Sequence, residues 1–242
     1  MSNYREIIAK NVAPLIEDGS FVNLGVGIPS LVSNYIPAGK TVILHGENGS
    51  AGLAGTVGND GVFDDAETFL NWEEAHRGEK TDYRTGHKDL TDACSDPAIL
   101  MPGACNFDIC LSFAMSRGGH LDMTVLGAMQ VDEEGSIANW MVPGVMVSGM
   151  GGGMDIISGA KKVVVAMQLC SKKGEPKIMK KCTLPLTALK RVSTVVTEKC
   201  ILEIREDGFH VVAMYPGVTR EELQKSVEPQ LIFEENMAVM AE

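Results

Sequence analysis

The sequence lacks several features that would point to particular classes of protein. Its six cysteines include no C-x-x-C pair, which argues against a zinc site or a disulfide framework and favours free thiols. The most apolar long segment, residues 140–160, is interrupted by proline, aspartate and glycines, so we predict no membrane span. The first residues, MSNYREII, lack the apolar stretch of a signal peptide, and we expect a cytoplasmic protein.

Positive charge is also scarce. The chain has 21 lysines and arginines against 32 aspartates and glutamates, which gives a net charge of −11. Such a surface repels nucleic acid and anionic membranes, so neither is expected as a partner. An anionic ligand would need backbone N–H groups or a second subunit to bind it.

What the sequence does have is enough apolar content for a sizeable core, with 45% hydrophobic residues in a chain of 242. Strands alternate with helical segments, and several strands are apolar on both faces, which indicates an α/β fold with a mostly parallel sheet. Asp207-Gly208 predicts a hairpin turn between two later strands. The other expected strands include residues 21–27, 41–46, 121–132 and 161–168, and the expected helices are residues 3–17, 28–36 and 220–227. Asn3 with Glu6 and Thr219 with Glu222 have the spacing of capping boxes at the starts of the first and last of these helices.

Residues 57–92 differ in character from the rest, because they are rich in acidic side chains and poor in periodic apolar ones. We therefore predict a single domain over residues 1–242 with a polar insertion at 57–92, in which residues near 66–77 form a helix. Glu73 and His76 share a face of that helix, which is typical of a solvated surface rather than a metal site. No metal is predicted.

Gly25 and Gly27 follow the first expected strand. A G-x-G turn between a strand and a helix, with an acid about 20 residues later, is typical of dinucleotide binding. Here the third glycine position is Ser30, and the helix before Pro37 is short. A tight structural turn is therefore the simplest interpretation. A turn in the wall of some other kind of site is a further alternative to dinucleotide binding.

Glu47 follows the strand "TVILHG" and stands in the glycine-rich sequence "GENGS". One interpretation places it beside a type I′ hairpin turn centred on Asn48-Gly49. The residues that follow are small and do not alternate as a return strand normally does, so we favour an elbow that projects one side chain. A carboxylate held in this way acts as a base, a metal ligand or a covalent nucleophile.

The run "GMGGGMD" (149–155) contains four glycines within five positions. It is interpreted either as a flexible surface loop or as a receptor for an anion, built from successive backbone N–H groups of Gly151, Gly152 and Gly153. The apolar residues on both sides favour a loop held between buried elements. Asn139 is interpreted as a further donor or as an ordinary turn residue.

Several stretches together resemble the β subunit of family I CoA-transferases, the 3-oxoacid, acetoacetate and butyrate group. They are "NLGVGIPSLVSNYIP", "HGENG", "PGACNFD", "SRGGHLDMTVLGAMQVDEEGSIANWMVPGVMVSGMGGGMDIISGAKKVVVAM" and "KKCTLPLT". The resemblance covers about residues 3–230 except 57–92. It implies an open three-layer αβα sandwich.

The resemblance also implies a mechanism. Glu47 falls on the covalent nucleophile, which carries CoA as a glutamyl thioester during ping-pong transfer between a short-chain acyl-CoA (butyryl-, acetoacetyl- or acetyl-CoA) and a carboxylate. Gly151–Gly153 and Asn139 fall on positions that face CoA or the oxyanion, and Gly25, Gly27, Asn48 and Gly49 form the site wall. Coenzyme A is a substrate, and no permanently bound cofactor is implied. The implied partner is an α subunit, in an αβ or α2β2 assembly.

The sequence departs from the family pattern at three places that affect the implied site. Gly46 replaces the usual serine, Gly153 stands where alanine is typical, and "TDACSDPAIL" replaces an Asn-Ala-Gly-Gly segment after the 57–92 insertion. The sequence also allows two alternative functions. One is a non-catalytic or sugar-phosphate-sensing domain of the same fold, and the other is an NAD-binding oxidoreductase that uses Gly25 and Gly27.

Overall fold

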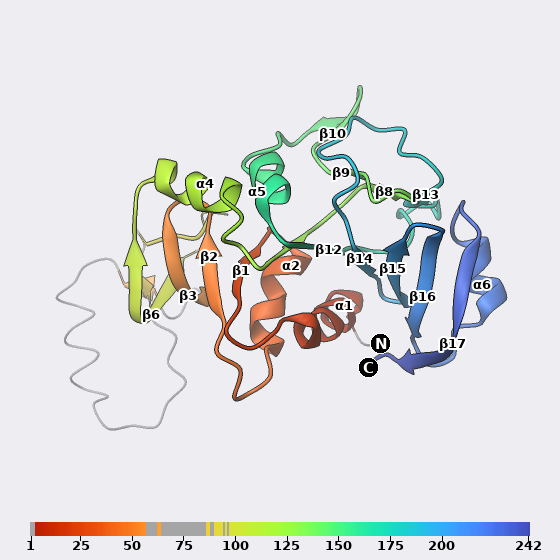
Figure 1. Ribbon diagram of the computed structural model, residues 1–242, viewed down its shortest axis with the longest axis horizontal. Coiled ribbons are helices and arrows are strands. Elements are labelled where there is room, and N and C mark those ends of the chain that lie inside the picture. Colours follow the sequence, from red (N-terminus) through yellow and green to blue (C-terminus); the bar gives the residue numbers. More distant parts are fainter. Residues whose placement is uncertain (1–2, 57–61, 64–85, 88–89, 94, 96) are drawn as a thin grey trace. The chain divides into compact units, whose positions relative to one another are not determined.

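The computed structural model describes residues 3–56, 62–63, 86–87, 90–93, 95 and 97–242 (Figure 1). Its contacts divide the chain into two compact units, one formed by residues 1–42 and 113–242 and the other by residues 43–112. The single-domain assignment stays a prediction, and most of the expected insertion, including the helix near 66–77, lies outside the described residues.

The sheet of the larger unit runs in the order β17-β16-β15-β14-β12-β7-β1. Parallel pairing joins β1 to β7, β7 to β12, β12 to β14 and β16 to β17, whereas β15 pairs antiparallel with β14 and β16. A mostly parallel sheet is therefore confirmed. The strands are β1 (Phe21–Leu24), β7 (Met123–Leu126), β12 (Lys162–Ala166), β14 (Thr194–Val196), β15 (Cys200–Arg205), β16 (Gly208–Met214) and β17 (Leu231–Val239).

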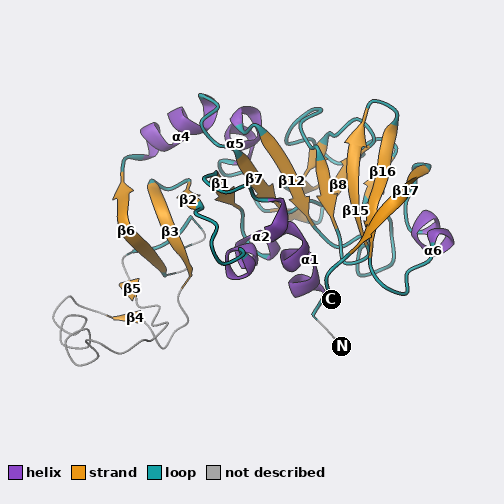
Figure 2. Cartoon of the chain, turned by 60° about the horizontal axis from the view of Figure 1, so that its bottom comes forward, coloured by secondary structure: helices purple, strands orange, loops and turns teal. Residues whose placement is uncertain are grey.

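Helices cover both faces of this sheet (Figure 2). Val163 and Val165 of β12 belong to the same core cluster as Ile156 and Ile157 of α5. Because successive strand residues point to opposite faces, Val164 faces the other side, where α1 runs. The α/β sandwich is confirmed. The helical segments of this unit are α1 (Tyr4–Val12), η1 (Ala13–Leu15), α2 (Ile28–Leu31), η2 (Val32–Tyr35), α5 (Gly153–Gly159) and α6 (Arg220–Lys225).

Both predicted helix caps are formed. The Asn3 side chain accepts a hydrogen bond from the Arg5 N–H at the start of α1, and Thr219 Oγ1 accepts one from the Glu222 N–H at the start of α6. Such caps satisfy backbone donors that have no partner within the helix. Short elements complete this unit, namely β8 (Gln130–Asp132), β9 (Ile137–Ala138), β10 (Met141–Val142), β11 (Met146–Val147) and β13 (Ile178–Met179).

The predicted hairpin between β15 and β16 is present, but its turn is displaced by one residue. Arg205 pairs with Gly208, so the two turn residues are Glu206 and Asp207 rather than Asp207 and Gly208. Gly208 has a φ of 122° and begins the return strand. The glycine therefore supplies a backbone conformation just after the turn that other residues rarely adopt.

The smaller unit contains a three-stranded antiparallel arrangement in the order β2-β3-β6. These strands are β2 (Ile43–Gly46), β3 (Ser50–Thr56) and β6 (Ala98–Asn106). A separate parallel pair joins β4 (Val62–Phe63) to β5 (Gly86–His87). Helix α4 (Ile109–Arg117) begins in this unit and continues into the larger one.

Candidate active site

Glu47 lies in the loop of a β-hairpin, and the elbow interpretation is therefore wrong in its local structure. Gly46 pairs with Ser50, the Gly49 N–H donates to the Gly46 carbonyl over 3.0 Å, and Gly49 has a φ of 120°. The loop is thus residues 47–49, with the glycine last rather than at the centre of a type I′ turn. Three-residue hairpin loops commonly end in such a glycine. The Glu47 side chain is half-buried and Asn48 is exposed.

The small residues that argued against a return strand are explained by close packing inside the sheet. A Cβ on Gly49 would lie 2.1 Å from the Phe107 carbonyl oxygen, and one on Gly52 would lie 2.7 Å from the Ala104 Cβ. Real Cβ atoms do not approach other atoms this closely. The glycines of β3 and its loop therefore let β6 and its continuation lie close to the hairpin.

A buried pair of polar side chains, His45 and Ser112, lies next to this hairpin. His45, one residue before Gly46, is 2% exposed, and its Nε2 lies 2.9 Å from Oγ of the fully buried Ser112 in α4. Its ring also stacks on Phe107 at a centroid distance of 6.4 Å. Burial lowers the pKa of His45 from 6.5 to about 4, so the imidazole next to the Glu47 loop is neutral at pH 7. Sequence analysis did not single out this pair.

In the larger unit, Gly25 and Gly27 lie just beyond the carboxyl end of β1. The Gly25 N–H donates to the Val125 carbonyl over 2.8 Å, and a Cβ on Gly25 would lie 3.0 Å from the Leu126 side chain. Gly27 has a φ of 90° and precedes α2. Because α2 has only four residues and continues as a 3-10 turn, it is too short to be the crossover helix of a dinucleotide-binding unit.

Asn139 is fixed by hydrogen bonds within the chain. Its Nδ2 donates to the Gly127 carbonyl over 3.2 Å, and its Oδ1 accepts from Thr187 Oγ1 over 2.6 Å. Its backbone N–H donates to the same Thr187 oxygen over 3.2 Å. Asn139 therefore ties the carboxyl end of β7 to the segment that contains Thr187. Thr187 was not singled out from the sequence, although it ends the "KKCTLPLT" stretch.

The glycine run connects the exposed β10–β11 hairpin to helix α5. Val145 and Val147 are 83% and 67% exposed, so the expectation that apolar neighbours bury this loop on both sides is wrong. The Gly153 N–H donates to the Met150 carbonyl over 2.9 Å. Within the described residues, the N–H groups of Gly151 and Gly152 have no acceptor. Gly151 is exposed, whereas Gly152 is buried.

The structure brings together part of the predicted site in each unit. In the larger unit, Thr187 contacts Asn139, and a Cβ on Gly153 would lie 3.8 Å from Thr187 Cγ2. Asn139 in turn reaches Gly127, at the carboxyl end of β7 next to Gly25 on β1. Ligands of open α/β sheets commonly bind at this edge. Glu47, Asn48 and Gly49 lie together in the smaller unit.

Among the described residues, no three His, Cys, Asp or Glu side chains are grouped so that they could hold a metal ion. In the same part of the chain, no helix is long and apolar enough to cross a membrane.

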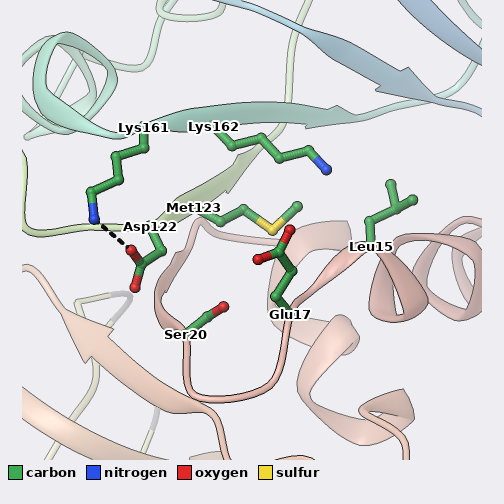
Figure 3. Close-up of a pocket in the computed structure, with 7 residues that line it drawn as sticks. All are labelled: Leu15, Glu17, Ser20, Asp122, Met123, Lys161 and Lys162. Atoms are coloured by element: carbon green, nitrogen blue, oxygen red, sulfur yellow. Dashed lines mark hydrogen bonds and ion pairs between the residues drawn. The ribbon is translucent and has the colours of Figure 1, made fainter.

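A cavity of about 230 Å³ lies at the amino ends of the parallel strands of the larger unit, opposite their carboxyl ends (Figure 3). It is lined by residues at the amino ends of three parallel strands, among them Ser20, Met123 and Lys162. Lys161 pairs with Asp122 over 2.8 Å, and chiefly this hydrogen bond lowers the pKa of Asp122. None of the predicted site residues lines this cavity.

Comparison with known proteins identifies the family of this chain. Residues 5–81 and 83–226 match the family model described as coenzyme A transferase. The acetate CoA-transferase subunit beta of Haemophilus influenzae is 40% identical over 238 residues, which is 98% of this chain and 96% of that protein. The human mitochondrial succinyl-CoA:3-ketoacid coenzyme A transferase 2 is 42% identical over 224 residues, 92% of this chain but only 39% of that protein.

Similarity to solved structures gives the same fold class. The crystal structure of an acyl-CoA transferase from Escherichia coli O157:H7 has a TM-score of 0.69 and 19% identity, and the match covers 99% of this chain and 43% of that one. By fold, this is an α/β protein of the kind found in acyl-CoA transferases. The chain belongs to the coenzyme A transferase family, and the resemblance to the β subunits of its family I is confirmed.

Proposed function

We propose that this chain is the β subunit of an enzyme that transfers CoA between a short-chain acyl-CoA and a carboxylate, with Glu47 as the covalent nucleophile. The observation that carries the proposal is the placement of Glu47 in a three-residue hairpin loop, half-buried on a backbone held by buried contacts. The relatives are an acetate CoA-transferase and a succinyl-CoA:3-ketoacid CoA transferase. They support acyl groups of this size without deciding among acetyl, acetoacetyl and butyryl.

The chemistry follows from the carboxylate. A Glu47 oxygen attacks the thioester carbonyl, the C–S bond breaks, and an acyl-glutamyl anhydride and CoA thiolate are formed. The thiolate then attacks the glutamyl carbonyl, which releases the first carboxylate and leaves CoA on Glu47 as a thioester. An acceptor carboxylate attacks this thioester and repeats the two steps in reverse. No net hydrolysis occurs, so the thioester bond energy passes to the new acyl-CoA.

Each attack places negative charge on a carbonyl oxygen, and preorganised N–H donors stabilise that charge. We propose that the N–H groups of Gly151 and Gly152 provide this stabilisation. The side-chain amide of Asn139 is already hydrogen-bonded to Gly127 and Thr187, so it holds these two segments together. Its proposed role is therefore to position the loops rather than to contact CoA.

The net charge of −11 makes this chain by itself a poor receptor for the polyanionic coenzyme A. The name of the Haemophilus relative, a subunit beta, implies a partner subunit for that protein. We propose that an α subunit completes the site here, in an αβ or α2β2 assembly. The isolated chain is then expected to be inactive, and the assembled complex active.

The test is a transferase assay on the complex with acetyl-CoA and with acetoacetate or butyrate as acceptor. Glu47→Gln is expected to lose at least about a thousandfold in rate, because an amide is a poor nucleophile and cannot form the thioester. Glu206→Gln is the matched control, since Glu206 is also a hairpin-turn glutamate but lies in the larger unit. Full activity of Glu47→Gln would contradict the proposal.

A further inference from the structure

Ser50 stands out because its hydroxyl has no partner. Its Oγ is the one buried side-chain nitrogen or oxygen, among the described residues, without a hydrogen bond, and Ser50 is 5% exposed. Buried hydroxyls normally have a partner, because removing one from water without a replacement hydrogen bond costs about 1–3 kcal/mol. A buried hydroxyl without a hydrogen bond in a well-packed hairpin therefore points to an acceptor that is formed only during the reaction.

The position of this hydroxyl places it at the Glu47 loop. Ser50 is paired with Gly46 across the hairpin, and a Cβ on Gly46 would lie 2.5 Å from Ser50 Oγ. The hydroxyl thus occupies the space that a side chain at position 46 would fill, directly beside the residue that precedes Glu47. The family resemblance places a serine at position 46, where this chain has glycine.

We propose that Ser50 donates a hydrogen bond to the carbonyl oxygen of Glu47 when this carboxylate becomes acylated. This inference rests on the proposed role of Glu47. A free carboxylate shares its charge between two oxygens and is well solvated, whereas the anhydride and the thioester present one carbonyl oxygen that turns into an oxyanion at each attack. Ser50 keeps its proton throughout, so it adds no step to the transfer.

The proposal also accounts for Gly46. A side chain at that position would collide with Ser50 Oγ and come within 2.9 Å of Asn48 Oδ1. The hairpin therefore has room for a hydroxyl-bearing side chain at position 46 or at position 50, but not at both. In this chain it comes from β3 rather than from β2.

The test compares Ser50→Ala with the double variant Gly46→Ser/Ser50→Ala in the assembled complex. Single-turnover formation of the CoA thioester on Glu47 is expected to slow at least about a hundredfold in Ser50→Ala, the lower end of what losing one oxyanion donor costs. The KM for acyl-CoA is expected to stay within about twofold, because the bond forms only after attack. The double variant returns the hydroxyl from position 46 and is expected to recover most of the rate.

Stability distinguishes this role from a structural one. Removing an unpartnered buried hydroxyl is expected to leave the thermal midpoint unchanged or higher. Ser112→Ala is the matched control, because Ser112 is also a buried serine of the smaller unit but is hydrogen-bonded to His45, and its midpoint is expected to fall.

Three results would overturn the inference. They are a wild-type rate in Ser50→Ala, a rate loss that comes with a lower midpoint, and a double variant no faster than Ser50→Ala. Activity of Glu47→Gln, measured in parallel, would instead refute the proposed function, so the two failures are separable.

Discussion

Thr187 Oγ1 donates a hydrogen bond of 2.6 Å to Asn139 Oδ1 and accepts one of 3.2 Å from the Asn139 backbone N–H. One hydroxyl thereby fixes both the side chain and the backbone of a residue that is 48 positions away in the sequence. The same threonine contributes the methyl group nearest to Gly153. Thr187 is thus the junction between two stretches that the sequence predicted to share a site.

The first prediction concerns this junction. Thr187→Val keeps the shape of the side chain but removes both hydrogen bonds, so the free energy of unfolding is expected to fall by about 1–3 kcal/mol. Transferase kcat is expected to fall about tenfold, because the glycine loop loses its fixed position. Thr187→Ser, which keeps the hydroxyl, is the control and is expected to retain most activity. A loss in Thr187→Ser as large as that in Thr187→Val would contradict the assignment of the effect to the hydroxyl.

The second prediction concerns Gly153, which stands where the family pattern has alanine. A Cβ there would meet only Thr187 Cγ2, at 3.8 Å, an ordinary contact. Gly153→Ala is therefore expected to raise the free energy of unfolding by about 0.4–1 kcal/mol with activity retained, since alanine restricts the unfolded chain. Gly151→Ala should do the opposite, because Gly151 has a φ of 48°. Chemical denaturation of both variants tests the contrast.

The third prediction is a pH dependence that arises from His45. Burial lowers its pKa to about 4 in the folded protein, against 6.5 in the unfolded chain. Between these values the unfolded chain binds the proton and the folded protein does not, so stability rises with pH over this window. The contribution of His45 is fully present above pH 6.5 and is lost progressively as the pH falls towards 4.

Denaturation at a series of pH values tests this sign. His45→Gln is expected to flatten the slope between pH 4 and 6.5, which for one such group approaches about 1.4 kcal/mol per pH unit. Ser112→Ala keeps the buried imidazole and is expected to lower stability at every pH while retaining the slope. A slope unchanged in His45→Gln would mean that other groups produce the acid sensitivity.

The sequence predicted elements better than it predicted turns. The strands of the larger unit and the capping roles of Asn3 and Thr219 follow from local patterns, because periodicity and capping act over a few residues. The β15–β16 turn lies one residue before its expected position, because Gly208 begins the return strand at positive φ. At Glu47 the favoured elbow was wrong, and the hairpin alternative put Gly49 at the centre of the turn, whereas Gly49 ends a three-residue loop.

What the sequence could not give depends on contacts between distant segments. The small residues after Gly49 do not have the pattern typical of a strand. They are small because Phe107 and Ala104, more than 50 residues away in the sequence, pack closely against this segment. Val145 and Val147 read as buried because they are apolar, yet they lie on an exposed hairpin. The supporting residues Thr187, His45 and Ser112 carry no local signal, since their partners are set by the fold.

The central claim is that Glu47 carries CoA during the reaction, and intact-mass measurement tests it most directly. The complex is incubated with acyl-CoA in the absence of an acceptor, and the mass of this chain is recorded before and after borohydride treatment. We expect a CoA thioester on Glu47 that borohydride removes by reduction, and no adduct on Glu47→Gln. An active complex without this adduct, or an adduct of equal yield on Glu47→Gln, would contradict it.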